Sequence, residues 1–282
     1  MKVIDTVSAL RQYRHGVTVE QSVAFVPTMG ALHEGHLALI KAAVASSAVV
    51  IVSLFVNPSQ FAPDEDYDAY PRDLDRDLAL LEPLGVAVVF VPSVKDIYPD
   101  EFSEQLRVSV GRLGAVFCGI SRPHFFSGVC SVLLRFFHLV QPNRVFMGEK
   151  DYQQCVVVKR LCEALFLDIE LVLCSTFRAE DGLALSSRNQ YLSVSERKEA
   201  ALIYRMFCLA QEFFDGSDTN AGRCLEIMRN YLMKHSSFRI DYLDFVDPYT
   251  LCPRMDLDDE GRFLFAGYLG TTRLIDNWRL RG

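Results

Sequence analysis

The sequence has no apolar segment long and uncharged enough to cross a bilayer, and its first residues lack the apolar stretch of a signal peptide. A cytoplasmic location is therefore expected. None of the eight cysteines forms a CxxC pair, which argues against both a disulfide framework and a zinc cluster. An excess of positive charge is also missing, and the formal net charge of −7 argues against general binding to nucleic acid or to an anionic membrane.

Short apolar runs alternate with segments of helical periodicity in the first 174 residues. Continuous hydrophobic strands separated by amphipathic helices are typical of a parallel sheet covered on both faces. Residues 1–174 are therefore predicted to form a doubly wound α/β domain, whose ligands bind beyond the carboxyl ends of the strands. The predicted strands are 23–27, 49–56, 87–91, 144–147 and 169–173, and the predicted helices are 35–46, 73–84, 130–140 and 155–166.

The pattern changes after residue 174. Ser193, followed three residues later by Glu196, predicts a capping box at the start of a helix. Residues 175–282 are predicted to form a smaller α+β domain. Its expected helices span about 195–214 and 220–234, and its expected strands are 240–245, 263–267 and 273–276.

The segment PTMGALHEGH, residues 27–36, follows the first predicted strand and opens a helix. Gly30 permits a tight turn, Gly35 allows close approach to the backbone, and the N–H groups of a helix N-terminus favour an anion. His33 and His36, one helical turn apart, could both face that anion and stabilise charge in phosphoryl or nucleotidyl chemistry. Two surface histidines in a helix cap are the alternative, and a metal site lacks a third ligand of suitable spacing. The position after a buried strand favours nucleotide binding.

Two further segments carry polar residues at expected strand ends. In FVNPSQF, residues 55–61, the amides of Asn57 and Gln60 suit a small polyol or hydroxy acid, although Asn-Pro is also a common turn starter. In GEKDYQQ, residues 148–154, Lys150 could place a charge on a phosphate and Asp151 could accept hydrogen bonds from a ribose. A charged helix N-cap is the plainer alternative for this second segment.

Two weaker signals remain. LSSRN, residues 185–189, combines two hydroxyls with a guanidinium and fits either a phosphate clamp or an ordinary surface loop. The acidic run from Asp64 to Asp77 could give Mg²⁺ one or two ligands, but such a run is more often a solvated helix face.

Six motifs occur in the order and approximate spacing typical of one family: PTMGALHEGH, FVNPSQF, YPRDLDRD, GEKDYQQ, DGLALSSRNQYLS and RLIDN. Across nearly its whole length the chain resembles the pantothenate synthetases, or pantoate:β-alanine ligases. The HxGH element is also similar to that of the wider nucleotidylyltransferase superfamily, related to class I aminoacyl-tRNA synthetases. The resemblance implies that ATP adenylates pantoate and that the amine of β-alanine then attacks the adenylate, giving pantothenate and AMP.

The resemblance also implies roles for individual residues. Those implied as catalytic are His33, His36, Lys150 and Arg188, with His36 as proton donor. Substrate contacts are implied for Gln60, Gln154 and Asn57. The implied ATP ligands are Met29, Gly30, His33, Gly35, His36, Gly148, Lys150, Asp151, Phe177, Leu185, Ser186, Ser187 and Arg188. It further implies a Rossmann-like N-terminal domain, a homodimer, a C-terminal lid associated with the dimer, and Mg²⁺ bound mainly through ATP. The family tends to pair two adjacent acids in the acidic run, but Arg76 precedes Asp77 here, so no protein metal site is assigned.

The chain departs from the family pattern in SRPHFFSGV, residues 121–129, where relatives usually read SRPGHF. The histidine stands one place early, at His124, and Phe125 takes its usual position, so the family histidine's role is not carried over. Another HxGH nucleotidylyltransferase, one that leaves the nucleotide on its product, would share the histidine motif. It would have no need of Gln60 and Gln154 together. A non-catalytic nucleotide-binding module would tolerate loss of His36 or Lys150, and both are present.

Overall fold

The computed structural model describes residues 1–63, 65–100 and 105–281. Asp64, the first acid of the run considered for Mg²⁺, lies outside the described residues. The chain forms two compact units, Met1–Glu149 with Val157–Ser175 and Lys150–Val156 with Thr176–Gly282. The sequence predicts a single boundary after residue 174, whereas this grouping also places Lys150–Val156 in the second unit.

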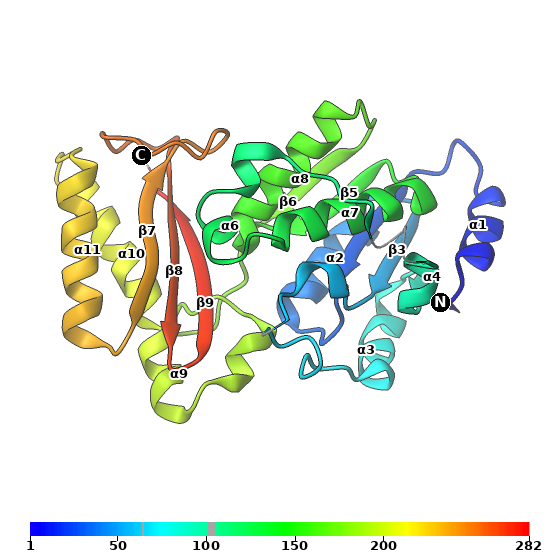
Figure 1. Cartoon of the computed structure of the whole chain (residues 1–282), viewed down its shortest axis with the longest axis horizontal. Coiled ribbons are helices and arrows are strands. Elements are labelled where there is room, and N and C mark those ends of the chain that lie inside the picture. Colours follow the sequence, from blue (N-terminus) through cyan, green and yellow to red (C-terminus); the bar gives the residue numbers. More distant parts are fainter. Residues whose placement is uncertain (64, 101–104, 282) are drawn as a thin grey trace. The chain divides into compact units, whose positions relative to one another are not determined.

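The first unit contains a six-stranded sheet in the order β1-β4-β3-β2-β5-β6. Strands β3, β5 and β6 are labelled in Figure 1. Every neighbouring pair is parallel, which confirms the predicted Rossmann-like α/β fold. Five strands match predicted runs, while the three-residue β1 was missed because only Ile4 of its side chains is buried. The strands are β1 (Lys2–Ile4), β2 (Val23–Thr28), β3 (Val49–Leu54), β4 (Val88–Phe90), β5 (Arg144–Gly148) and β6 (Glu170–Cys174).

Helices cover this sheet because alternate residues of each strand point to opposite faces. Ala24 and Val26 of β2 belong to a core cluster with Ile40 of α2 (Glu34–Ser46). Phe25, between them, meets the ring of Phe136 from α7 (Phe125–Val140) with 5.8 Å between centroids. The remaining α-helices of this part of the chain are α1 (Val7–His15), α3 (Leu74–Leu81), α4 (Val94–Ile97), α6 (Cys118–Ser121) and α8 (Tyr152–Ala164).

Four of these helices differ from the sequence prediction, which contains neither α1 nor the four-residue helices α4 and α6. Helix α1 is only nine residues long and Leu10 is its single buried residue, so it lacks the long buried stripe of the predicted helices. Helix α7 begins at Phe125, five residues before the predicted start at 130. Short 3₁₀ turns connect the elements: η1 (Pro58–Gln60), η2 (Glu82–Leu84), η3 (Gly111–Gly114), η4 (Glu149–Asp151) and η5 (Ser187–Tyr191).

The loop after β2 is held by the carboxylate of Asp77, which is 2% exposed. Its Oδ2 accepts the N–H of Ala31 at 2.8 Å and its Oδ1 accepts the N–H of Leu32 at 2.9 Å. Gly30 and Ala31 have φ values of +80° and +51°, so this turn passes through the left-handed region at two consecutive residues. Burial raises the pKa of the Asp77 carboxyl, and the two backbone N–H groups oppose that change. The carboxylate thereby fixes the chain just before α2.

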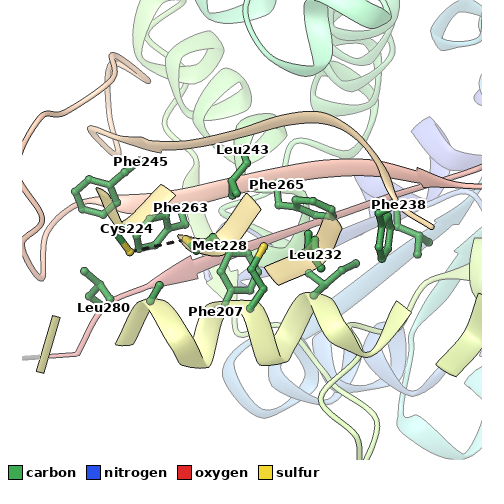
Figure 2. Packing of buried hydrophobic residues seen from close by; sticks show 14 of the residues in the cluster. Phe207, Cys224, Met228, Leu232, Phe238, Leu243, Phe245, Phe263, Phe265 and Leu280 are labelled. Carbon is green, nitrogen blue, oxygen red and sulfur yellow. Dashed lines mark hydrogen bonds between the residues drawn. The ribbon is translucent and has the colours of Figure 1, made fainter. Parts of the chain in front are cut away.

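The second unit is built on the antiparallel sheet β7-β8-β9. Helices α10 and α11 lie side by side along it (Figure 1), and they bury a shared apolar core that includes Phe207, Met228 and Phe265 (Figure 2). This confirms the predicted C-terminal α+β unit. The elements are α9 (Val194–Ala200), α10 (Leu202–Asp215), α11 (Ala221–His235), β7 (Arg239–Val246), β8 (Arg262–Leu269) and β9 (Thr272–Arg279).

Two local predictions in this unit can be compared with the structure. The capping box is confirmed: Ser193 N–H donates to Glu196 Oε2 at 2.8 Å, and Glu196 N–H donates to Ser193 Oγ at 3.3 Å. The single helix predicted over about 195–214 is two helices, α9 and α10, separated at Ala201. Among the described residues, no helix combines the length and the apolar character that a bilayer span requires.

We expect Asp77→Asn to lower the free energy of unfolding by about 2–4 kcal/mol, because an amide accepts only one of the two backbone N–H groups and turns its own donors toward the other. Urea denaturation measures the change. Asp75→Asn is the matched control, because Asp75 is exposed in the same helix. Equal stability of the two variants would contradict the role assigned to Asp77.

Candidate active site

His33 and His36 lie side by side at the N-terminus of α2. Their ring centroids are 4.0 Å apart with an angle of 31° between the ring planes. His33 is the N-cap residue, and its backbone N–H donates to Nδ1 of His36 at 3.3 Å. In the neutral imidazole the other nitrogen, Nε2, then carries the proton and is a donor. Both rings are half-buried. The first turn of α2, which includes Gly35, thus offers a donor to an anion at a helix N-terminus.

Gln60 and Met29 are brought together by the folded chain. The side-chain amide of Gln60, in η1, donates through Nε2 to Sδ of Met29 at 3.0 Å, and the residue is 9% exposed. Arg122 Nη2 donates to the main-chain oxygen of Gln60 at 3.3 Å and also binds Glu65. This role of Arg122 was missed from the sequence, because its partners lie about sixty residues away in the chain.

Asn57 differs from its expected role as a substrate ligand. The residue is 1% exposed, and its Oδ1 accepts hydrogen bonds from Ser59 and from the Tyr98 hydroxyl, the latter at 2.8 Å. Its Nδ2 donates at 3.2 Å to both Gln60 Oε1 and the main-chain oxygen of Gly128. A Cβ atom on Gly128 would meet the main-chain oxygen of Ser59 at 2.2 Å, so glycine is what lets α7 approach this turn. Asn57 therefore orients Gln60 through contacts within the protein.

Gly148 lies at the carboxyl end of β5, next to β2 in the sheet. The register pairs Ala24 with Arg144, so Thr28 and Gly148 end the two strands at the same level. The strand order also reverses here, since β3 and β4 follow β2 on one side and β5 and β6 lie on the other. Ligands of open α/β sheets bind at such a reversal. Met29, Gly30, His33, Gly35 and His36 follow the end of β2, Gln60 follows the end of β3, and Gly148 is the last residue of β5. These are the strand ends at which the sequence predicts them.

Lys150, Asp151 and Gln154 belong to the second unit. Lys150 and Asp151 are in the turn η4, and Gln154 lies in the first turn of α8. This strand, turn and helix succession is the one the sequence predicts for GEKDYQQ. All three side chains are half-buried. They are therefore partly accessible to a ligand.

Phe177 and Leu185 are paired across a hairpin in the second unit. The N–H of Leu185 donates to the main-chain oxygen of Phe177 at 2.9 Å, and a β-bridge joins Arg178 to Ala184. Ser186 caps the turn that follows, since its Oγ accepts the N–H of Arg188 at 3.3 Å. Phe177 is 45% exposed, and Leu185, Ser186, Ser187 and Arg188 are half-buried.

Asp77 supports the histidine motif through the fold, a role that the sequence does not predict. The acidic run was interpreted as a solvated helix face, yet Asp77 is buried and binds two backbone N–H groups. The burial of Asp77 could have been inferred from helix periodicity. It lies four residues after Asp73, the N-cap of α3, and on the same face of the helix as Leu81, which is also buried. Within residues 1–63, 65–100 and 105–281, no His, Cys, Asp and Glu side chains form a cluster suited to a metal ion.

The thiols of Cys130 and Cys224 are buried, whereas the shifted histidine, His124, is exposed. Burial raises the pKa of Cys130 and Cys224 to about 12, so these thiols are protonated and non-nucleophilic at neutral pH. His124 is exposed and serves as the N-cap residue of α7. Its neighbour Phe125 packs against the guanidinium of Arg122, 3.9 Å from the ring centroid.

Known proteins resemble this chain over almost its whole length. A family model described as pantoate-beta-alanine ligase matches residues 2–279. The chain is 45% identical over 257 residues to the pantothenate synthetase of Caldicellulosiruptor saccharolyticus, an alignment covering 91% of each protein. Its structure is similar to the crystal structure of pantothenate synthetase from Thermus thermophilus, with a TM-score of 0.94, 44% identity and complete coverage of both chains.

A second solved structure carries ligands. The pantoate-beta-alanine ligase of Francisella tularensis, complexed with beta-gamma ATP and β-alanine, has a TM-score of 0.83 and 35% identity over 99% of this chain and 97% of its own. These matches confirm the resemblance that the six motifs suggested. The chain therefore belongs to the pantoate–β-alanine ligase family, whose members are also called pantothenate synthetases.

Proposed function

We propose that this pantoate–β-alanine ligase forms pantothenate in two steps, through a pantoyl adenylate. In the first step a carboxylate oxygen of pantoate attacks the α-phosphorus of ATP, and the bond to the bridging oxygen breaks to release pyrophosphate. In the second step the amine of β-alanine attacks the acyl carbon, AMP leaves with the C–O electron pair, and the amine loses a proton. The overall ligase reaction follows from the family match over residues 2–279.

The histidine pair at the N-terminus of α2 is the observation that supports nucleotide binding. The donor at Nε2 of His36 and the N-terminal end of α2 both attract negative charge. Negative charge accumulates on the phosphate oxygens as pyrophosphate leaves, so fixed donors at that position lower the barrier. We assign His36 as a proton donor to the phosphates and His33 as its partner.

The side-chain amide of Gln60 is assigned to hydrogen-bond pantoate and to contact the β-alanine site. Its orientation is set by Asn57 and Met29, so the amide is fixed before a substrate arrives. Pre-orientation lowers the entropy lost on binding, which matters where two small substrates must meet. Asn57 is assigned a positioning role in place of the expected substrate contact.

Further substrate contacts are assigned to residues of the second unit. Lys150 places a point charge on phosphate, and Arg188 adds a guanidinium from the turn after the hairpin. Gln154 is assigned to pantoate, and Asp151, Phe177, Leu185, Ser186 and Ser187 are assigned to ATP. Together with Met29, Gly30, Gly35 and Gly148 these complete the proposed set.

Three further assignments stay predictions. Mg²⁺ is expected to be held mainly by ATP, in agreement with the use of Asp77 in the fold. The homodimer and its associated lid are predicted from the family resemblance. The cytoplasmic location is predicted from the sequence.

Exchange of radiolabelled pyrophosphate into ATP tests the intermediate. We expect exchange when pantoate is present and β-alanine is absent, because the first step is reversible and needs no amine. Exchange should disappear when pantoate is omitted. Failure of exchange under both conditions, in enzyme that still makes pantothenate, would rule out the adenylate.

His36→Ala should slow the pantoate-dependent exchange by about 10²–10⁴-fold, the usual contribution of a general acid. The fold should persist, with a loss of no more than about 1 kcal/mol in unfolding free energy, because the hydrogen bond that His36 accepts from the His33 N–H is local and only half-buried. His15→Ala is the control, since His15 is exposed at the end of α1. Full exchange in His36→Ala would show that the role is misassigned.

A further inference from the structure

The motif RLIDN, residues 273–277, marks the family resemblance but receives no role from it. Its last two residues, Asp276 and Asn277, lie on β9 and are 3% and 4% exposed. Buried polar side chains need partners inside the protein. The Asp276 carboxylate accepts two hydrogen bonds from Arg178, at 2.6 and 3.0 Å. Asn277 has a different partner: its Nδ2 donates to the main-chain oxygen of Lys150 at 3.0 Å.

The orientation of the Asn277 amide is fixed by chemistry. Its Oδ1 accepts a hydrogen bond from Arg262 Nη1 at 2.5 Å, and Arg262 is 8% exposed. A guanidinium can only donate and a main-chain carbonyl can only accept, so the flipped amide would face a like group on both sides. The Nδ2 group must therefore point at Lys150.

Two more contacts tie the same segment to the C-terminal sheet and the loop after its first strand. The guanidinium of Arg262 lies over the ring of Tyr152, 3.9 Å from the ring centroid. The Tyr152 hydroxyl donates to the main-chain oxygen of Pro248 at 3.1 Å. The backbone of Lys150 is thus held by Asn277, and the side chain of Tyr152 is held by Arg262 and Pro248. These contacts explain why Lys150–Val156 groups with the second unit although β5 and most of α8 belong to the first.

We propose that Asn277 is a positioning residue for Lys150: its amide, oriented by Arg262, fixes the backbone from which the Lys150 ammonium reaches phosphate. The proposal rests on the phosphate-binding role assigned to Lys150. It gives the C-terminal sheet a part in nucleotide binding, although no side chain of β9 has to touch the nucleotide.

A double-mutant cycle tests the proposal with four proteins: the parent, Asn277→Asp, Lys150→Ala and the double variant. Asn277→Asp keeps the side-chain shape and the acceptor for Arg262, but it loses the donor to Lys150. We expect the KM for ATP to rise roughly tenfold in Asn277→Asp, with the KM for β-alanine unchanged. In the Lys150→Ala background the same substitution should change kcat/KM for ATP by less than about twofold, because the group being positioned is gone.

Tyr152→Phe provides a second variant in case Asn277→Asp folds poorly, since it removes only the hydroxyl that binds Pro248. A smaller rise in the KM for ATP is expected, again dependent on Lys150. Asp241→Asn is the matched control on the same sheet, because it removes the ion pair with Arg273 without touching residues 150–152. Its KM for ATP should equal that of the parent.

The outcomes separate this inference from the proposed function. If Lys150→Ala lowers kcat/KM for ATP and the effect of Asn277→Asp is just as large in that background, Lys150 keeps its role and the positioning role of Asn277 is wrong. If Lys150→Ala leaves kcat/KM for ATP unchanged, the assignment of Lys150 fails and the inference fails with it. If Asn277→Asp raises the KM for ATP tenfold in the parent and has no further effect in the Lys150→Ala background, both the phosphate-binding role of Lys150 and the positioning role of Asn277 are supported.

Discussion

The histidine motif depends on two hydrogen bonds, which the Asp77 carboxylate accepts from the backbone N–H groups of Ala31 and Leu32. Gly30 and Ala31 both adopt left-handed backbone conformations, and a turn of that kind leaves its N–H groups pointing in one direction with no backbone partner. A buried carboxylate satisfies them at a cost in desolvation, which its raised pKa records. His33 and His36 then begin α2 in one orientation, with their rings in contact.

Several buried polar side chains in this protein orient a neighbour that is better placed to meet a ligand. Asn57 holds the amide of Gln60, and Asn277 holds the main chain of Lys150. Each asparagine is almost fully buried and uses both its oxygen and its nitrogen. An amide suits this work because it donates and accepts at once without the desolvation cost of a charge. Gln60 is buried and Lys150 is half-buried, and in each case a buried asparagine fixes one part of the residue.

The elements most successfully predicted from sequence were those with a strong hydrophobic period. Strand β3 is buried at every residue, and its run was visible without any partner. Helix α1 and strand β1 are short and each buries only one side chain, so neither shows the repeated buried positions of the predicted elements. The motifs located His33, His36, Gln60 and Lys150 because glycine, proline and the change from strand to helix mark the ends of parallel strands. Asn57 was recognised as polar and loop-bound, but its burial was not.

By itself the sequence determined the alternation of buried strands and helices, the family, and the residues at the strand ends. These depend on local periodicity and on short motifs, both of which are properties of neighbouring residues. Tertiary structure decided which polar groups meet a ligand and which support the fold. Asp77 reaches the β2 loop across more than forty residues, and Asn277 reaches Lys150 across more than a hundred. Their partners are main-chain atoms, which every residue carries, so nothing in the sequence of the partner identifies the contact.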